Sequence, residues 1–197
     1  ATKDPGFSGT LKGDFRLTGD SHGPLMQVQA RTEGLNLFRL PLNEASGGIV
    51  WSGKEISLKD WTIPLWGGGI TLSGQIHPDG EKGDLNLKGT FADLDLLLAS
   101  QTFEMPIKLS GKASGTFGLS GLSEDPVLDL KAQAPQFFVD GFGTTEAILR
   151  AKGPLSGVEI ETFEALVGES KLSGKGFLSL VTPWEFRFNV SGNELDL

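Results

Sequence analysis

The sequence predicts an all-β protein, an elongated, curved antiparallel sheet with a hydrophobic concave interior. Three observations carry this prediction. Apolar and polar residues alternate with a period of two along most of the chain, 28 of the 197 residues are glycine, and the pattern recurs at an offset of 102 residues, as in Ser8 and Ser110. A period of two places successive side chains on opposite faces of a strand. Glycines spread through apolar segments are typical of strands that bend or pack backbone to backbone.

The alternation is clearest at the start of the chain. One face of the first predicted strand holds Phe7, Gly9, Leu11, Gly13, Phe15, Leu17 and Gly19, and the other holds Lys12, Asp14, Arg16 and Thr18. Residues 26–31 and 84–91 alternate in the same way. Clusters of Gly, Pro, Asp and Ser predict turns at 20–24, 47–48, 67–69, 78–80, 123–126 and 182–183. Helical periodicity is nearly absent, and only residues 144–150 (TTEAILR) leave a short helix open as an alternative.

An internal duplication organises the chain. Residues 7–45 align with residues 109–147, so that Phe15 coincides with Phe117. Further on, both copies skip one residue before an aromatic side chain, Trp61 or Phe163, which predicts a shared β-bulge. We therefore predict two β-groove units, residues 1–105 and 106–197, in one continuous structure.

No second set of segments is predicted to cover the apolar face, so the sheet is expected to curl over on itself, with glycines relieving the crowding. The residues expected to line the inner face are Phe15, Leu17, Met26, Val28, Ile56, Leu58, Trp61, Ile63, Leu85, Leu87, Phe117, Leu119, Leu128, Leu130, Val158, Ile160, Phe163, Phe186 and Phe188. Alternating Leu and Phe are also ordinary core residues. For a residue such as Leu87 the sequence allows two interpretations, a place in the lining of an open groove or a place in a packed core.

Composition narrows the function classes. A net charge of −8 and a pI of 4.8 disfavour nucleic acids and anionic membrane surfaces. The chain has no cysteine, which excludes disulfides and thiolate metal sites. No apolar run approaches the roughly 18 residues of a spanning helix. Because the chain begins and ends close to strand patterns, we expect it to be a segment of a longer protein.

Catalytic and metal-binding patterns are weak. His22 and His77 both lie beside turn residues, and carboxylate pairs such as Asp93/Asp95 are typical of a solvated strand face. The glycine run at 67–69 lacks the Lys-Ser/Thr pair of a phosphate loop. We therefore predict no enzymatic activity, no cofactor and no metal.

The order of several motifs resembles a known family. These motifs are LSGKASGTFGLSG (109–121), DPVLDLKA (125–132), VEIETFEALVGESKLSGKG (158–176) and SGNELDL (191–197), and the first half of the chain repeats them more loosely. This order resembles the repeated β-segments of the TamB branch of the AsmA-like proteins, a superfamily of repeating β-grooves linked to bridge-like lipid transfer. The resemblance covers essentially the whole chain.

The resemblance implies a taco-shaped groove in a periplasmic protein anchored in the inner membrane of a diderm bacterium. It implies phospholipid transport between inner and outer membranes and support of outer-membrane biogenesis. Phospholipid acyl chains and an outer-membrane partner protein would then be the binding partners. The chain shows no anchor and no recognisable docking segment, so the docking role is not transferred. Burial of an acyl chain stabilises by about 0.8 kcal/mol per methylene, and hydrophobic burial carries no orientation requirement.

Two alternatives remain. Trp51, Trp61 and Trp66 lie close together in sequence, and aromatic side chains on a sheet are how many modules stack sugars, which predicts a carbohydrate-binding or adhesin-type β-module. A chaperone-like groove for outer-membrane β-strands shares the same fold and differs only in its ligand.

Overall fold

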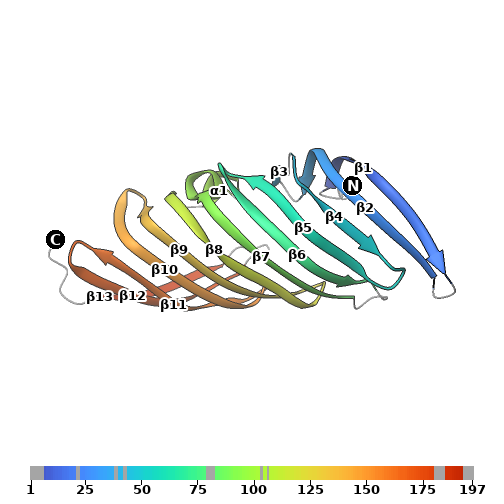
Figure 1. The fold of residues 1–197 in the computed structure, drawn as a ribbon. Coiled ribbons are helices and arrows are strands. Elements are labelled where there is room, and N and C mark those ends of the chain that lie inside the picture. Colours follow the sequence, from blue (N-terminus) through green and yellow to red (C-terminus); the bar gives the residue numbers. More distant parts are fainter. Residues whose placement is uncertain are drawn as a thin grey trace, which may run out of the picture.

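The computed structural model describes residues 7–20, 23–37, 40–41, 44–78, 83–102, 104–105, 107–179 and 185–192. Within these residues the chain forms a 13-stranded antiparallel sheet and one short helix (Figure 1), which confirms the all-β prediction. The elements are β1 (Phe7–Asp20), β2 (Gly23–Leu37), β3 (Leu40–Pro41), β4 (Ser46–Trp51), β5 (Ile56–Leu65), β6 (Gly68–His77), β7 (Asp84–Asp95), α1 (Leu96–Thr102), β8 (Leu109–Leu122), β9 (Val127–Val139), β10 (Phe142–Pro154), β11 (Val158–Val167), β12 (Ser170–Leu178) and β13 (Phe186–Gly192).

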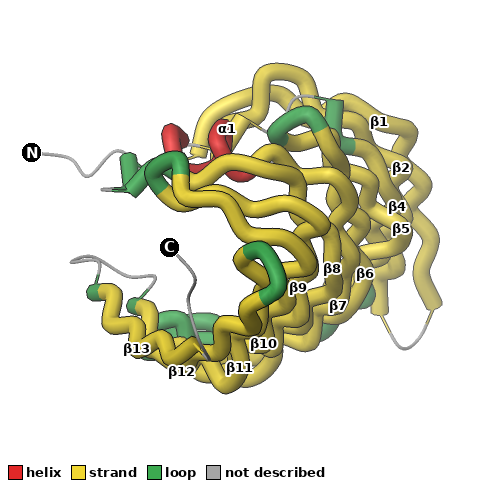
Figure 2. The backbone as a smooth tube through the Cα atoms, turned by 90° about the vertical axis from the view of Figure 1, so that its left-hand side faces the viewer, coloured by secondary structure: helices red, strands yellow, loops and turns green. Residues whose placement is uncertain are grey.

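The sheet is a meander in which each strand pairs with the next, apart from β3, which pairs only with β2. As a result β1 and β13 lie at opposite ends of the array (Figure 1). Viewed along the array, the strands bend into an open curve (Figure 2), so the sheet is both elongated and curved. Apart from the segment between β7 and β8, which contains α1, the connections are short because antiparallel neighbours require no crossover.

Bulges bend the strands at comparable places. The pairing of β5 with β6 shifts between Leu58 and Trp61, and that of β11 with β12 shifts between Ile160 and Phe163. The predicted bulge before each aromatic residue is therefore confirmed. Asp60 has a φ of 49° and Asp93 one of 55°, the left-handed conformation that a bulge residue adopts. The backbone amide of Asp60 donates to Ser73 Oγ (3.1 Å), so a side chain from the next strand satisfies the donor that the bulge leaves unpaired.

Strand boundaries follow the sequence duplication. β8 begins and ends 102 residues after β1, and β11 begins and ends 102 residues after β5. The bulge of β11 also lies at the position that corresponds to the bulge of β5. The strands of the first copy, β1 to β7, therefore form one half of the sheet. The strands of the second copy, β8 to β13, follow them in the other half.

One expected turn was wrong, and the helix that the sequence left open as an alternative is not formed. Residues 144–150 lie inside β10 and form no helix, because Leu149 and Ala151 continue the apolar face of β9. Gly47 and Gly48 lie within β4, where Gly47 admits the Trp61 side chain, and make no turn. The turn at 123–126 is present between β8 and β9, whereas residues 182–183 lie outside the described residues.

The helix α1 was not predicted. Asp95 ends β7 and caps the helix, its Oδ1 accepting the backbone amides of Leu97 (2.8 Å) and Leu98 (3.2 Å). Trp66 reaches the other end of the helix, with Nε1 donating to Thr102 Oγ1 (3.1 Å). The helix contacts β7 and β8 and leads the chain from one to the other. A helix of seven residues is too short to show a periodic pattern in sequence.

Candidate functional site: the apolar face of the sheet

The strand register gathers the predicted lining residues onto one face. Residues that lie directly opposite each other in neighbouring strands point to the same side of a sheet. From β1 to β10 one such row across the strands contains Phe15, Val28, Ile49, Leu58, Gly74, Leu87, Leu119, Leu128 and Gly153. Each of these residues is apolar or glycine. The row therefore forms an unbroken apolar path along the array.

Parallel rows extend this surface. A second row, from β5 to β13, contains Trp61, Leu72, Gly89, Phe117, Leu130, Ala151, Ile160, Gly176 and Phe188. A third contains Ile63, Ile70, Phe91, Gly115, Ala132, Leu149, Phe163, Gly174 and Val190. A fourth, from β1 to β8, contains Leu17, Met26, Trp51, Ile56, Ile76, Leu85 and Gly121. We call the surface made by these four rows the apolar face.

All but two of the predicted lining residues lie in these rows. Val158 pairs with Leu178, which in turn pairs with Phe186, so these positions extend the same face. The side chain of Phe186 lies outside the described residues. Sequence reasoning missed Ile49, Ile70, Leu72, Phe91 and Leu149, which complete the rows. Each of them alternates with polar residues in its own strand, and this alternation could have identified them in the sequence. Only the pairing of the strands shows that they are neighbours.

Burial varies along the apolar face. Val158 is 1% exposed, whereas Leu17, on the first strand, is 73% exposed. Most members of the rows between them are half-buried. The high exposure of Leu17 follows from its place on β1, which in the described residues has a neighbouring strand on one side only.

Aromatic rings lie over glycines on adjacent strands. A Cβ atom on Gly89 would lie 2.5 Å from Cζ of Phe117, and one on Gly115 would lie 2.7 Å from Cζ of Phe91. The Phe117 ring of β8 thus lies over Gly89 of β7, and the Phe91 ring of β7 lies over Gly115 of β8. Trp61 lies over Gly47 in the same manner. These pairs fill the space that a glycine leaves on a pleated surface.

At its C-terminal end the apolar face is partly filled by its own side chains. The Phe163 ring makes edge-to-face contacts with Phe137 (6.5 Å between centroids) and Phe188 (5.3 Å). Phe188 reaches β11 from β13 by lying over Gly174 and Gly176 of the strand between them. Here the contacts are those of a packed core.

The opposite face is polar. It carries exposed ion pairs such as Lys152–Asp129 (3.6 Å) and Lys171–Glu164 (2.9 Å), which typically contribute about 1 kcal/mol or less each. A shallow cavity of about 590 Å³ adjoins Thr71, Lys88, Thr116 and Lys131, as well as Leu87, Phe117 and Leu119. Most of its lining residues have the phase of the polar face. This cavity thus differs from the surface that the sequence predicts to bind ligand.

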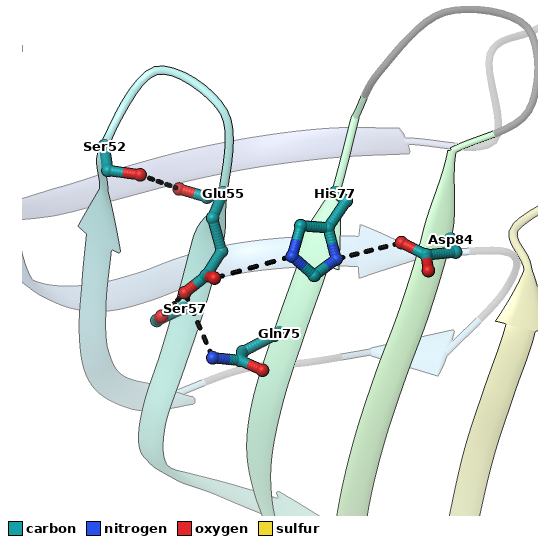
Figure 3. A network of polar contacts seen from close by, with 6 residues as sticks. All are labelled: Ser52, Glu55, Ser57, Gln75, His77 and Asp84. Carbon is teal, nitrogen blue, oxygen red and sulfur yellow. Dashed lines mark hydrogen bonds and ion pairs between the residues drawn. The ribbon is translucent and has the colours of Figure 1, made fainter. Parts of the chain in front are cut away.

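A network of polar contacts joins β5, β6 and β7 (Figure 3). His77 Nδ1 lies 2.9 Å from Asp84 Oδ1, and its Nε2 lies 3.4 Å from Glu55 Oε2. The hydroxyl of Ser57 donates to Glu55 (2.7 Å), and this bond is the main cause of the lowered pKa of Glu55. These contacts hold the three strands together through the Glu55 carboxylate and the His77 ring. In the described residues no group of three His, Cys, Asp or Glu is arranged to hold a metal ion.

Trp61 and Trp66 use their indole nitrogens within the protein. Trp61 Nε1 donates to the carbonyl of Gly48 (3.0 Å), and Trp66 bonds Thr102. Trp51 is 36% exposed and lies in a row of the apolar face, opposite Met26 and Ile56. These contacts hold the Trp61 and Trp66 rings in place within the protein.

None of the helices in the described residues has the length and hydropathy to cross a membrane. Comparison of the chain with protein-family models, curated proteins and solved structures finds no match.

Proposed function

We propose that the apolar face binds the acyl chains of lipids and lets them move along the array. The observation that carries the proposal is the continuity of the rows. Every position from Trp61 on β5 to Phe188 on β13 is apolar or glycine. A hydrocarbon chain requires such a surface because it offers no polar group for directional bonding.

The dimensions suit an acyl chain. Strands lie about 4.8 Å apart, so a row from β5 to β13 measures roughly 40 Å. Two opposed acyl chains fill the roughly 30 Å hydrocarbon core of a bilayer, which makes one chain about 15 Å long. A single row is therefore longer than one acyl chain, and a bound lipid has more than one place along it, although the aromatic rings at the C-terminal end already pack against one another. Sites of similar affinity allow movement, whereas one deep site would retain the lipid.

We place the apolar face on the concave side of the sheet. Two observations support this placement. Most side chains of this face are half-buried or buried although, in the described residues, the sheet is a single layer; the exposed members are Phe15, Leu17, Trp51, Gly121 and Val190. The small side chains of Ala134, Ala147 and Ala165 also pack together beside the bulges, where the strands bend. Side chains converge on the inside of a bend and spread apart on its outside. Small residues are therefore required on the inside.

The cellular role that we propose follows the resemblance to AsmA-like proteins of the TamB branch. In this role the chain is a segment of a periplasm-spanning protein anchored in the inner membrane. It conducts phospholipids between the inner and outer membranes and supports outer-membrane biogenesis. The open curve of the sheet (Figure 2) leaves a charged head group free to remain in water while the acyl chain lies inside.

The test is direct. The purified chain is examined by native mass spectrometry and by lipid extraction, and its uptake of a fluorescent fatty acid is titrated. We expect co-purified phospholipid and saturable uptake. A lipid-free protein that takes up no fatty acid contradicts the proposal. Binding of unfolded outer-membrane strands without lipid uptake favours the chaperone alternative.

A further inference from the structure

Three phenylalanine rings form a continuous series of contacts over the strands from β9 to β13. Phe137 on β9 contacts Phe163 on β11 (6.5 Å between ring centroids), and Phe163 contacts Phe188 on β13 (5.3 Å). The two strands of each pair are not neighbours, because β10 lies between β9 and β11 and β12 lies between β11 and β13. Each contact therefore passes over the strand in between.

The strands that the rings cross carry small residues at the crossing points. On β10 this residue is Ala147, which is 7% exposed and belongs to a cluster against which both Phe137 and Phe163 pack. On β12 it is Gly176, where a Cβ atom would lie 2.7 Å from Cδ2 of Phe188. Larger side chains at these two positions would hold the rings apart.

Phe163 is the centre of the series. Its ring packs against the cluster that contains Ala147 and also against a second cluster of buried residues, Ala151, Val158 and Ile160. In contrast, the members of the apolar rows on β4 to β8 are half-buried or exposed. Side chains of the protein thus fill the apolar face over β10 and β11 and leave it more accessible over β4 to β8.

The first copy of the duplication has a different arrangement. Trp61 corresponds to Phe163, but its ring lies over β4, where Nε1 donates to the carbonyl of Gly48 (3.0 Å). Leu35 and Leu85 stand at the places of Phe137 and Phe188, the latter two in the matching sequences LNLKG (85–89) and FNVSG (188–192). The series of rings is therefore a feature of the second copy that the repeated pattern does not impose.

We propose that these three rings, which we call the aromatic barrier, stop a bound hydrocarbon chain at β9. The inference rests on the proposed function, since it concerns an acyl chain on the apolar face. Hydrocarbon is stabilised by contact with apolar groups that are still accessible, and over β10 and β11 these groups already contact the protein. The acyl chain therefore lies over β4 to β8. It passes β9 only when the Phe163 ring turns aside and gives up both of its ring contacts.

A photoreactive fatty acid locates the bound hydrocarbon. The probe carries a diazirine on its hydrocarbon chain, the mixture with the full chain is irradiated, and mass spectrometry of peptides identifies the crosslinked residues. In the unchanged chain we expect crosslinks on β4 to β8 and a yield on β10 to β13 that is about tenfold lower or less. Phe163→Ala is expected to raise the yield on β10 to β13 about tenfold, because removal of the central ring breaks the barrier.

Two further variants complete the experiment. Phe163→Leu retains an apolar side chain in the core but loses the ring contacts, so it decides the matter if Phe163→Ala does not fold, and it is expected to shift crosslinks in the same direction. Phe142→Leu is the matched control, since Phe142 is a half-exposed phenylalanine on β10 outside the four rows, and it is expected to leave the distribution unchanged. Circular dichroism verifies the fold of each variant.

The outcomes separate this inference from the proposed function. Absence of saturable crosslinking anywhere on the unchanged chain contradicts lipid binding itself. Equal yields on β4 to β8 and β10 to β13 of the unchanged chain leave lipid binding intact but overturn the barrier. A distribution that stays restricted in folded Phe163→Leu and Phe163→Ala also overturns it, because the Phe163 ring would then not be what stops the hydrocarbon.

Discussion

The ring of Phe117 occupies the space above Gly89, so that a Cβ atom on this glycine would lie 2.5 Å from Cζ of the ring. The two residues are direct partners across β7 and β8 and lie in the middle of a row of the apolar face. The Cβ atom would also lie 2.3 Å from the backbone carbonyl oxygen of Thr71 on β6, so glycine at this position is a packing requirement of both neighbouring strands.

Replacement of Gly89 by valine is expected to destabilise the protein by about 1–3 kcal/mol, because the ring and the adjacent backbone must move. Gly118→Val is the matched control. A Cβ atom on Gly118 would have its nearest neighbour, the carbonyl of Leu87, 3.8 Å away. Urea unfolding measures both variants, and equal losses of stability would contradict the close packing at Gly89.

A charge on the apolar face is expected to block ligand uptake. Leu87→Asp places a carboxylate in the row between Gly74 and Leu119, where an acyl chain would have to lie beside it. Lys88→Asp, on the opposite face of the same strand, is the control. We expect the first variant to lower fatty-acid affinity about tenfold or more and the second to leave it unchanged. If both variants remain folded and bind equally, the apolar face is not the binding surface.

Enlargement of a side chain at the bend tests the concave placement. Ala165 is 2% exposed and packs against Ala134 and Ala147, so Ala165→Leu is expected to cost about 1–3 kcal/mol through overpacking. Ala92→Leu, at an exposed position on β7, is expected to change stability by about 0.5 kcal/mol or less. Thermal unfolding compares the two variants. A neutral Ala165→Leu would show that side chains do not converge there.

Asp125 makes stability depend on pH. Its carboxylate accepts the hydroxyl and the backbone amide of Ser156, and these bonds lower the pKa of Asp125, the hydroxyl contributing most. A lowered folded-state pKa stabilises the protein above the unfolded-state value of about 3.9, and this stabilisation is lost as the pH falls through the folded-state pKa. Ser156→Ala is therefore expected to reduce stability at neutral pH.

Urea unfolding of both proteins from about pH 6 to about pH 2 measures this effect. The difference in stability between the unchanged chain and Ser156→Ala should shrink as the pH falls. A difference that is constant across this range would mean that the hydroxyl acts on stability without favouring the ionised carboxylate.

The sequence by itself determined the class of the fold and the face on which each side chain lies. In residues 116–119, for example, Phe117 and Leu119 alternate with Thr116 and Gly118. Only a strand places such alternating residues on two separate faces. The duplication also located the bulges before Trp61 and Phe163, because a skipped residue changes the phase of the pattern within the sequence itself.

The tertiary structure decided which side chains become neighbours. Gly47 was expected in a turn, and only the arrival of Trp61 from β5 explains its place inside β4. Residues 144–150 lie in β10 because strands on both sides supply hydrogen bonds that a local helix would have to replace. At the end of helix α1, Thr102 is bonded by Trp66, which lies 36 residues earlier in the chain. Such features rest on contacts between residues far apart in the chain, and a local pattern carries no record of them.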